Sequence, residues 1–335
     1  MNSETTSPES QVMQYILGKW ISKPIHTAVE LGIADILIKK DRHIEELAEK
    51  TETLPDELYR MMRALSSVGI FAELENRVFV NTPLSECLTE SRLKYAVLMF
   101  HSPWHDKMWN NLLYSLKTGK PAFEKVFDTP AFEWFRENPE EAEIFHKANS
   151  FKAVFSHGVI AKEYDFSRIN TLTDVGGGLG NLMVEILKIN THMKGIVAEL
   201  PEMVTHVDGI IKTNNLENRM SAVECNFFKK IPGGSEAYLF SHIVHDWPDK
   251  KCITILKNCR KVIPPEGRLL IAETVIPEGN TFSISKFLDL EVLLMGGGCE
   301  RNKEEFKNLM KKSGFRLSQI IPTKENISII EGVPE

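Results

Sequence analysis

The chain has 335 residues, of which 42% are hydrophobic, and a formal net charge of −6, a composition typical of a globular protein with one large domain or two ordinary ones. The acidic balance argues against a surface for nucleic acid or an anionic membrane, and no apolar run reaches the roughly 18 residues that a membrane span needs. The five cysteines form no Cys-x-x-Cys pair and are odd in number, which favours reduced thiols over a disulfide framework or a zinc site. The polar first ten residues lack the features of a signal peptide, so we expect a cytoplasmic protein. From the cysteine pattern we expect no metal site.

The first 95 residues are predicted to form a helical module of their own. From Tyr15 to about Leu37, apolar residues recur at helical spacing and indicate one or two largely buried helices, with Gly32 as a break. Two more helical segments, at 43–50 and 54–69, are followed by a short β-hairpin. Helix, helix and hairpin is the order of elements in a winged helix.

A winged helix most often binds DNA, so a regulator has to be considered for this module. Against it, the second helix carries Glu57, Tyr59 and Met62 where a DNA-binding helix has a dense basic face. A dimerisation module on the same frame is favoured, because the N-terminal helices have more apolar surface than a module of this size can bury alone. The residues that we expect to offer this surface are Trp20, Ile21, Ile25 and Val29.

Residues 96–165 are predicted to be helical and are rich in aromatic side chains. Most of these side chains are expected to pack in the core, because aromatics at helical spacing usually do. In sequence the segment lies between the N-terminal module and a glycine-rich turn. We therefore expect a helical linker that roofs a site at the strand ends, with Trp104 and Phe145 among the pocket residues.

The last part of the chain, 166–335, opens with Thr-Leu-Thr-Asp-Val-Gly-Gly-Gly-Leu-Gly at 171–180, which predicts a buried strand, a tight turn and then a helix. A dinucleotide fingerprint has its glycines in the order Gly-x-Gly-x-x-Gly, but here Asn181 takes the third position. The Gly-Lys-Ser/Thr of a phosphate loop does not follow either. What remains is the acidic-x-Gly-x-Gly-x-Gly turn of S-adenosylmethionine (SAM)-dependent methyltransferases, with a plain turn of another α/β protein as the alternative.

Strands and helices alternate after this turn, which predicts a Rossmann-like, doubly wound α/β sheet of seven strands. Its last strands form a hairpin at 315–321 and 326–331, and an antiparallel strand there is a feature of methyltransferase sheets rather than dinucleotide-binding ones. The other strands after the turn are predicted at 195–199, 220–224, 237–241 and 268–273, and the helices near 181–189, 201–213, 250–262 and 302–312.

Polar residues at the strand ends are candidates for cofactor contacts. Glu199 ends the second strand, where an open α/β sheet places a carboxylate that accepts hydrogen bonds from ribose hydroxyls. Asp174 is expected to orient the glycine turn or to meet the amino-acid end of the cofactor. After the third strand, Asn226 and Phe227 are placed to hold an adenine. The structural alternatives are a helix cap for the acids and loop packing for Phe227.

The segment Ser-His-Ile-Val-His-Asp-Trp-Pro-Asp at 241–249 follows the fourth strand and contains the candidate base, His245. An imidazole can accept a proton near neutral pH, although a histidine here could also simply cap the next helix. Two carboxylates strengthen the catalytic interpretation: Glu273 ends the fifth strand, and Glu300 lies in a glycine-rich loop, expected to be flexible, before a helix. A carboxylate on one imidazole nitrogen fixes the tautomer and favours imidazolium, which suits a base that takes a proton from a phenol. Either acid could instead be a surface charge.

The chain resembles the small-molecule O-methyltransferases typified by plant caffeate, hydroxyindole and bacterial phenazine or polyketide methyltransferases. The resemblance is carried, in order, by the glycine turn at 171–180 and by the segments around Glu199, Asn226, His245, Glu273 and Glu300. The resemblance covers nearly the whole chain. It implies a homodimer in which the glycine turn, including Gly176 and Gly178, holds SAM and releases S-adenosylhomocysteine (SAH), while His245 deprotonates a small hydroxyl acceptor between Glu273 and Glu300. On the same basis we assign Asp246 to the catalytic group, Leu200 and Ser241 to the cofactor, and His242, Met295 and Asn149 to the acceptor.

The chain departs from the plant pattern at three of these positions. Asn226 stands where the family often has Asp, but an amide oxygen still accepts a hydrogen bond from an amine. Ser241 replaces a common Lys, and Asn149 replaces a Met that clamps flat phenylpropanoids, which favours a more polar acceptor. Two alternatives stay open from the sequence: a SAM-binding relative that catalyses a cyclisation or hydroxylation, and a DNA-binding regulator with a ligand domain.

Overall fold

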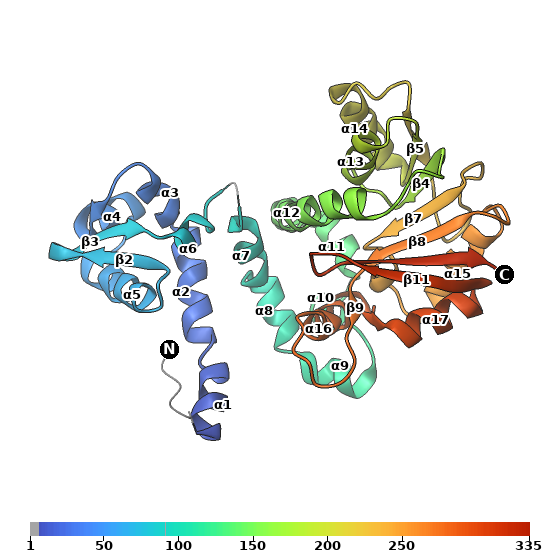
Figure 1. Ribbon diagram of the computed structural model, residues 1–335. Helices are drawn as coiled ribbons and strands as arrows, with labels where there is room; N and C mark the ends of the chain where they lie inside the picture. Colours follow the sequence, from blue (N-terminus) through green and yellow to red (C-terminus); the bar gives the residue numbers. More distant parts are fainter. Residues whose placement is uncertain (1–6, 91) are drawn as a thin grey trace. The chain divides into compact units, whose positions relative to one another are not determined.

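The computed structural model describes residues 7–90 and 92–335, with the backbone alone at 150–155 (Figure 1). The chain forms two compact units. The first comprises the chain up to Lys107 together with Phe135–Phe151, and the second comprises Met108–Trp134 together with Lys152–Glu335.

The first unit is mainly helical and contains a small antiparallel sheet. The strands lie in the order β1 (Arg42–His43), β3 (Val78–Asn81), β2 (Phe71–Leu74). The predicted order of two helices and a hairpin is confirmed by α4, α5 and the β2–β3 pair (Figure 1). The helices of this unit up to residue 100 are α1 (Pro8–Ile16), α2 (Lys19–Glu30), α3 (Ile33–Ile38), α4 (Ile44–Thr51), α5 (Pro55–Ser67), α6 (Pro83–Glu86) and α7 (Lys94–Phe100).

The sequence indicated one or two largely buried helices from Tyr15 to about Leu37, and this prediction is wrong for α1 and for the start of α2. Helix α1 has no buried residue, and the side chains of Trp20 and Ile21 are 73% and 44% exposed. The expectation that Val29 offers surface to a second copy is wrong, because Val29 is 3% exposed and belongs to the apolar core of the unit. Helix α2 contacts α3, α5 and α7, and its buried residues, Ala28 and Val29, lie in its last turn, whereas Trp20 and Ile21 near its start stay exposed.

The predicted helical character of 96–165 is confirmed. After α7, this part of the chain forms α8 (Pro103–Trp109), α9 (Leu112–Thr118), α10 (Ala122–Phe127), α11 (Ala131–Glu137) and α12 (Pro139–Glu163). Its aromatic side chains pack mostly on one another: the rings of Phe135 and Phe145 stack with centroids 4.5 Å apart, and those of Phe123 and Trp134 meet edge to face at 5.6 Å.

The second unit is built on a seven-stranded sheet, which confirms the predicted fold class. Its order is β11-β12-β8-β7-β4-β5-β6, in which β12 is antiparallel to both of its neighbours, β11 and β8, and the remaining pairs are parallel. The bounds are β4 (Thr171–Val175), β5 (Lys194–Glu199), β6 (Met220–Glu224), β7 (Ala237–Ser241), β8 (Arg268–Glu273), β11 (Phe315–Pro322) and β12 (Ser328–Pro334).

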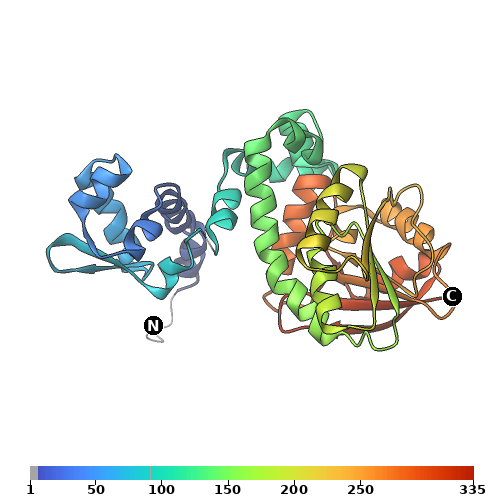
Figure 2. The same ribbon diagram turned by 90° about the horizontal axis from the view of Figure 1, so that it is seen from above.

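Helices cover both faces of this sheet (Figure 2). One core cluster joins Leu172, Leu239 and Leu270 to α13 (Asn181–Ile189), α14 (Pro201–Thr213) and the end of α12. The other joins Tyr238, Phe240 and their neighbours to α15 (Asp249–Arg260) and α17 (Lys303–Lys312). Alternate residues of β7 therefore face opposite cores, which explains why this strand reads as a continuous apolar run.

In the second unit, helix α16 (Ser285–Gly296) and the pairing of β9 (Val275–Ile276) with β10 (Arg301–Asn302) were not predicted. Helix α16 follows β9, and β9 pairs in parallel with β10. The segment between α16 and α17, expected as a flexible loop, is instead held by this pairing and by a hydrogen bond from Cys299 N to the carbonyl of His245, at 2.9 Å. These contacts come from residues far away in sequence, so the local pattern does not contain them.

Candidate active site

The candidate residues of the second unit gather where the parallel strands end. Strands β4, β5, β7 and β8 run in the same direction, so the glycine turn, Glu199, the loop with His245 and Glu273 all follow carboxyl ends on one edge of the sheet. In open α/β sheets this edge is where ligands bind. The order of these strands brings the cofactor and base candidates of the sequence together.

The glycine turn between β4 and α13 needs glycine for two reasons. Gly176, Gly178 and Gly180 have φ values of +74°, +57° and +79°, a region that L-residues with side chains rarely adopt. In addition, a Cβ on Gly176 would lie 2.6 Å from Cδ1 of Ile243. The backbone of the turn can therefore approach a ligand closely, and no side chain intervenes.

Glu199 is joined to this turn. Its Oε2 accepts a hydrogen bond from the backbone N–H of Gly178 at 3.0 Å, and its Oε1 accepts one from the N–H of Leu200 at 2.8 Å. The side chain lies at the start of α14 and is partly accessible. A fixed carboxylate with further lone pairs can accept hydrogen bonds from a pair of ribose hydroxyls.

Asp174 lies beneath the turn and is 1% exposed. Neither carboxylate oxygen has a hydrogen-bond partner among the residues that the structure describes, and a Cβ on Gly177 would lie 2.6 Å from Oδ2. Burial, and then the charge of Glu199, raises the pKa of Asp174 to about 7. A buried carboxylate without a partner fits a cationic ligand, so the turn and the two acids suit SAM, which carries an ammonium and a sulfonium.

Asn226 and Phe227 follow β6 on the same edge. Asn226 Oδ1 accepts a hydrogen bond from the N–H of Phe228 at 3.1 Å, which leaves its second lone pair for a ligand. The amide of Asn258 donates to the carbonyls of Phe227 and Phe228, both at 3.0 Å. The ring of Phe227 lies 3.6 Å from the Cβ position of Gly176, so it borders the glycine turn, as an adenine-packing residue must.

His245 lies in a short 3₁₀ helix, Val244–Asp246, after β7, and its side chain is 13% exposed. Its Nδ1 and Oε1 of Glu300 are 2.7 Å apart, and its backbone N–H donates to Oε1 of Glu273 at 2.9 Å. Oδ1 of Asp246 lies 3.5 Å from Nε2. When Nδ1 donates its proton to Glu300, Nε2 carries the lone pair and is the nitrogen that can accept a proton from a ligand.

The carboxylates decide the basicity of this histidine. Burial by itself lowers the pKa of His245, but Asp246, Glu300 and Glu273 together outweigh burial and raise it to about 10. Burial, and then the charge of Glu300, raises the pKa of Glu273 to about 7, and burial raises that of Asp246. A pKa near 10 matches that of a phenol, so a proton can pass between the two at little cost.

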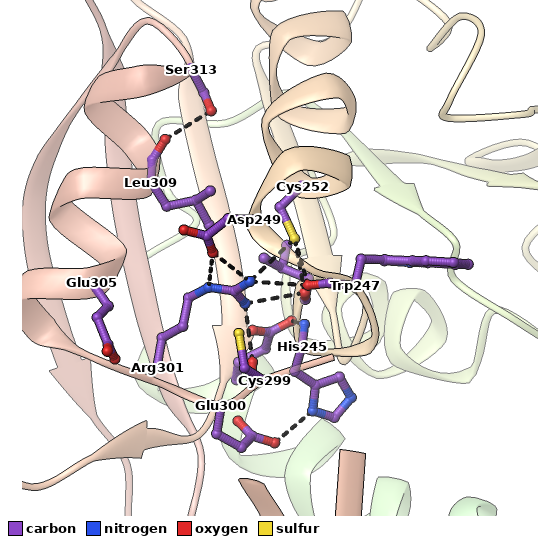
Figure 3. A network of polar contacts seen from close by, with 12 residues as sticks. His245, Trp247, Asp249, Cys252, Cys299, Glu300, Arg301, Glu305, Leu309 and Ser313 are labelled. Atoms are coloured by element: carbon purple, nitrogen blue, oxygen red, sulfur yellow. Dashed lines mark hydrogen bonds and ion pairs between the residues drawn. The ribbon is translucent and has the colours of Figure 1, made fainter. Parts of the chain in front are cut away.

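Figure 3 shows His245 and Glu300 with the contacts of Arg301 beside them. The backbone N–H of Glu300 donates to Oδ1 of Asp289 in α16 at 2.8 Å, and the guanidinium of Arg301 lies between the segments of His245 and Cys299. Within the described ranges, 7–90 and 92–335, Oε2 of Glu273 and Oε2 of Glu300 have no hydrogen-bond partner. Sequence reasoning missed the roles of Asp289 and Arg301, although Arg301 immediately follows Glu300 in the sequence.

The acceptor candidates fall in both units. His242 is next to the base: its ring centroid lies 5.5 Å from that of His245, and its φ of +55° is uncommon for a residue with a side chain. Met295 lies in the last turn of α16, which contacts the 3₁₀ helix of His245. Trp104, Phe145 and Asn149 belong to the first unit, and their role in acceptor binding stays a prediction.

The remaining cofactor candidates are at the same strand ends. Ser241 ends β7, and its Oγ is buried without a partner in the part of the chain that is described. Leu200 precedes α14 and is 37% exposed. Among the described residues, no three His, Cys, Asp or Glu side chains are arranged to hold a metal ion, and no helix combines the length and the apolar character of a membrane span.

Two family models cover most of the chain. The model of the O-methyltransferase domain matches residues 109–316, and that of the O-methyltransferase dimerisation domain matches residues 13–91. The chain belongs to the O-methyltransferase family. It is a SAM-dependent O-methyltransferase, and the resemblance drawn from the sequence is confirmed.

Relatives extend over nearly the full length of this O-methyltransferase. The phenazine O-methyltransferase PhzM of Lysobacter antibioticus is 35% identical over 329 residues, which cover 97% of this chain and 96% of the relative. The structure of the mitomycin 7-O-methyltransferase MmcR gives a TM-score of 0.91 at 31% identity and covers 98% of both chains. NcsB1 from neocarzinostatin biosynthesis, solved with SAM and 2-hydroxy-5-methyl naphthoic acid, gives 0.81 at 26% identity and covers 94% of this chain and 96% of that one.

Proposed function

We propose that this O-methyltransferase moves the methyl group of SAM to a phenolic or enolic hydroxyl of a small aromatic or polyketide-like metabolite, with His245 as the base. The observation that carries the proposal is the hydrogen bond between Nδ1 of His245 and the buried Glu300, which leaves Nε2 as the nitrogen that can take a proton from an acceptor. Two observations support an aromatic hydroxyl as the acceptor. Relatives are named as phenazine and mitomycin O-methyltransferases, and NcsB1 was solved with a hydroxy-naphthoic acid.

The cofactor would be held by groups of the second unit. Glu199 would accept the ribose hydroxyls, Asp174 would face the cationic amino-acid end, and Asn226 and Phe227 would hold the adenine. When bound, SAM supplies an electrophilic methyl group on a sulfonium. The backbone of the glycine turn contributes close approach without side chains in the way.

The proton balance of the transfer falls on His245. SAM would supply the methyl group and leave as neutral SAH, and Nε2 of His245 would take the proton of the acceptor hydroxyl. The resulting imidazolium is stabilised by Glu300, Asp246 and Glu273, whose fields already raise the pKa of His245 to about 10. The protein therefore stabilises a phenolate beside an imidazolium, while positioning the oxygen is its other main contribution.

We also propose that the enzyme is a homodimer formed through the first unit. The match of the dimerisation-domain model to residues 13–91 supports it. The exposed apolar side chains on α1 and α2 also support a homodimer, because monomeric proteins rarely expose a large cluster of apolar side chains to solvent. These residues are Val12, Met13, Tyr15, Ile16, Trp20 and Ile21.

The test is His245→Gln with a hydroxyphenazine or a hydroxynaphthoic acid as the acceptor. We expect turnover, measured as SAH and methylated product by mass spectrometry, to fall by about 10²–10⁴-fold. The dissociation constant of SAM, measured by calorimetry, should stay within a factor of a few. His206→Gln on the exposed face of α14 is the matched control and should leave both unchanged.

Near wild-type turnover of His245→Gln on an accepted substrate would refute the role of His245 as the base. Proximity of the two reactants would then account for the transfer. A lack of methylated product for every hydroxyl acceptor, together with tight SAM binding, would refute the proposed acceptor class.

A further inference from the structure

Arg301 is a buried cation next to the proposed base. It follows Glu300 in β10 and is 2% exposed, and its guanidinium lies between the segment of His245 and the start of α15 (Figure 3). Burying a charge this completely is costly unless its donors are satisfied. The contacts of Arg301 therefore have to be accounted for.

Every N–H of the guanidinium has an acceptor. Nη1 donates to the carbonyls of Val244 and Cys299 at 3.2 and 3.1 Å, and Nη2 donates to the carbonyl of Trp247 at 3.0 Å. Nε and Nη2 both donate to Oδ1 of Asp249, at 3.1 and 3.0 Å. Nη2 also lies 3.4 Å from Sγ of Cys252.

The positions of these acceptors in the sequence connect Arg301 to the base. Val244 and Trp247 flank the pair His245 and Asp246, and Cys299 immediately precedes Glu300. One rigid group thus ties the chain that carries the imidazole to the chain that carries its carboxylate partner. The hydrogen bond from Cys299 N to the His245 carbonyl, at 2.9 Å, closes the same connection from the other side.

We infer that Arg301 is a positioning residue for methyl transfer: it holds His245 and Glu300 at hydrogen-bonding distance and acts on the reaction only through them. The inference rests on the proposed role of His245. Arginine is required because its planar fork reaches carbonyls in several directions at once, whereas a lysine ammonium is a point charge with three donors.

The guanidinium also contributes charge to the site. The titratable groups around it are Asp249 and Cys252 of α15, Cys299, and Glu273 at the end of β8. The guanidinium acts to lower the pKa of Glu273, against the effect of burial. Because the contact with Glu300 helps to raise the pKa of His245, separating these two residues by removing Arg301 should lower the pKa of His245. Removal of Arg301 should therefore change the pH dependence of the reaction as well as its rate.

The experiment compares Arg301→Ala and Arg301→Lys with Arg219→Ala. Arg219 is the matched control, because its Nη1 also donates to backbone carbonyls. These are the carbonyls of Leu187 in α13 and of Asn190 and Met193 between α13 and β5, at 3.1, 3.3 and 3.4 Å. Turnover with a hydroxyphenazine, the dissociation constant of SAM and the melting temperature are measured for each variant. Guanidinium chloride at millimolar concentration is added to Arg301→Ala to restore the missing group.

We expect turnover to fall by about 10²-fold or more in Arg301→Ala and by about 10-fold or more in Arg301→Lys, with SAM affinity within a factor of about 3. Guanidinium should restore at least ~10-fold of the rate of Arg301→Ala, and the alkaline pKa in the kcat/KM profile should move down from that of the wild type. Arg219→Ala should lose stability but keep its turnover within a factor of about 3. In a His245→Gln background, Arg301→Ala should cost little more, because the two residues act as one unit.

Wild-type turnover in folded Arg301→Lys, or an equal loss of turnover in Arg219→Ala at equal melting temperature, would overturn the inference. An unchanged pH profile or a lack of rescue in Arg301→Ala would do so too. The proposed function fails separately, since it requires a loss in His245→Gln alone. A large loss there with none in the Arg301 variants removes only the role of Arg301.

Discussion

Gly298 is the residue whose substitution tests the geometry of the site most directly. Its backbone does not adopt the left-handed conformation, so alanine meets no strain in φ. A Cβ there would, however, lie 2.0 Å from the carbonyl oxygen of His245 and 2.7 Å from the carbonyl carbon of Asp246. Gly298 is glycine because the chain that leads to Glu300 packs directly on the chain of the base.

The magnitude follows from these distances. Real Cβ contacts essentially never fall under 3.0 Å, so the two segments must separate by about 1 Å at the His245 carbonyl. This separation strains the hydrogen bond from Cys299 N and changes the 2.7 Å distance from His245 to Glu300. A misplacement of ~1 Å near the chemistry costs about 10²-fold in rate, and overpacking costs about 1–3 kcal/mol in stability.

The assay is turnover of Gly298→Ala with a hydroxyphenazine, followed as SAH release, alongside calorimetry with SAM and thermal unfolding. We expect turnover to fall by about 10²-fold while the affinity for SAM is kept, because the cofactor residues lie on other loops. Gly296→Ala is the matched control: its Cβ would lie 3.6 Å from the carbonyl oxygen of Asp246, an ordinary contact, in the last turn of α16. If Gly298→Ala turns over within a factor of about 3 of Gly296→Ala, the close packing of these two segments does not govern the base.

Three further expectations concern ionisation, the cofactor and assembly. For a phenol of pKa ~10, kcat/KM should rise with pH to about 10, because His245 stays protonated up to its raised pKa; a plateau from about 6.5 would mean that the carboxylates do not raise it. Glu199→Ala should weaken SAM binding by about 1–3 kcal/mol in calorimetry, whereas Glu202→Ala on the exposed first turn of α14 should not, and equal affinities would remove Glu199 from the cofactor site. Light scattering should give about twice 38.1 kDa for the wild type and a smaller mass for Trp20→Asp, and a wild-type mass near 38.1 kDa at micromolar concentration would exclude the homodimer.

Several features could be predicted from the sequence because they depend on local pattern. Strand β7 reads as an apolar run because helices cover both of its faces, and the glycines at 176, 178 and 180 indicate a turn with positive φ. A further prediction follows from the topology of a parallel sheet: residues that end different strands lie at the same edge, because the carboxyl ends of parallel strands meet there. From the sequence alone, this rule places Glu199, His245 and Glu273 at one edge of the sheet.

The tertiary structure decided what depends on contacts between distant residues. Glu300 contacts the imidazole of His245, which lies 55 positions earlier in the chain. Asp289 in α16 and Arg301 in β10 donate or accept hydrogen bonds beside this contact, and no periodicity in the sequence predicts them. Trp20 is exposed and Val29 is buried, because the last turn of α2 packs in the apolar core of the first unit and its first turn does not. The ionisation of His245 was settled in the same way, because burial and three carboxylates act in opposite directions and only their spatial arrangement fixes the net result.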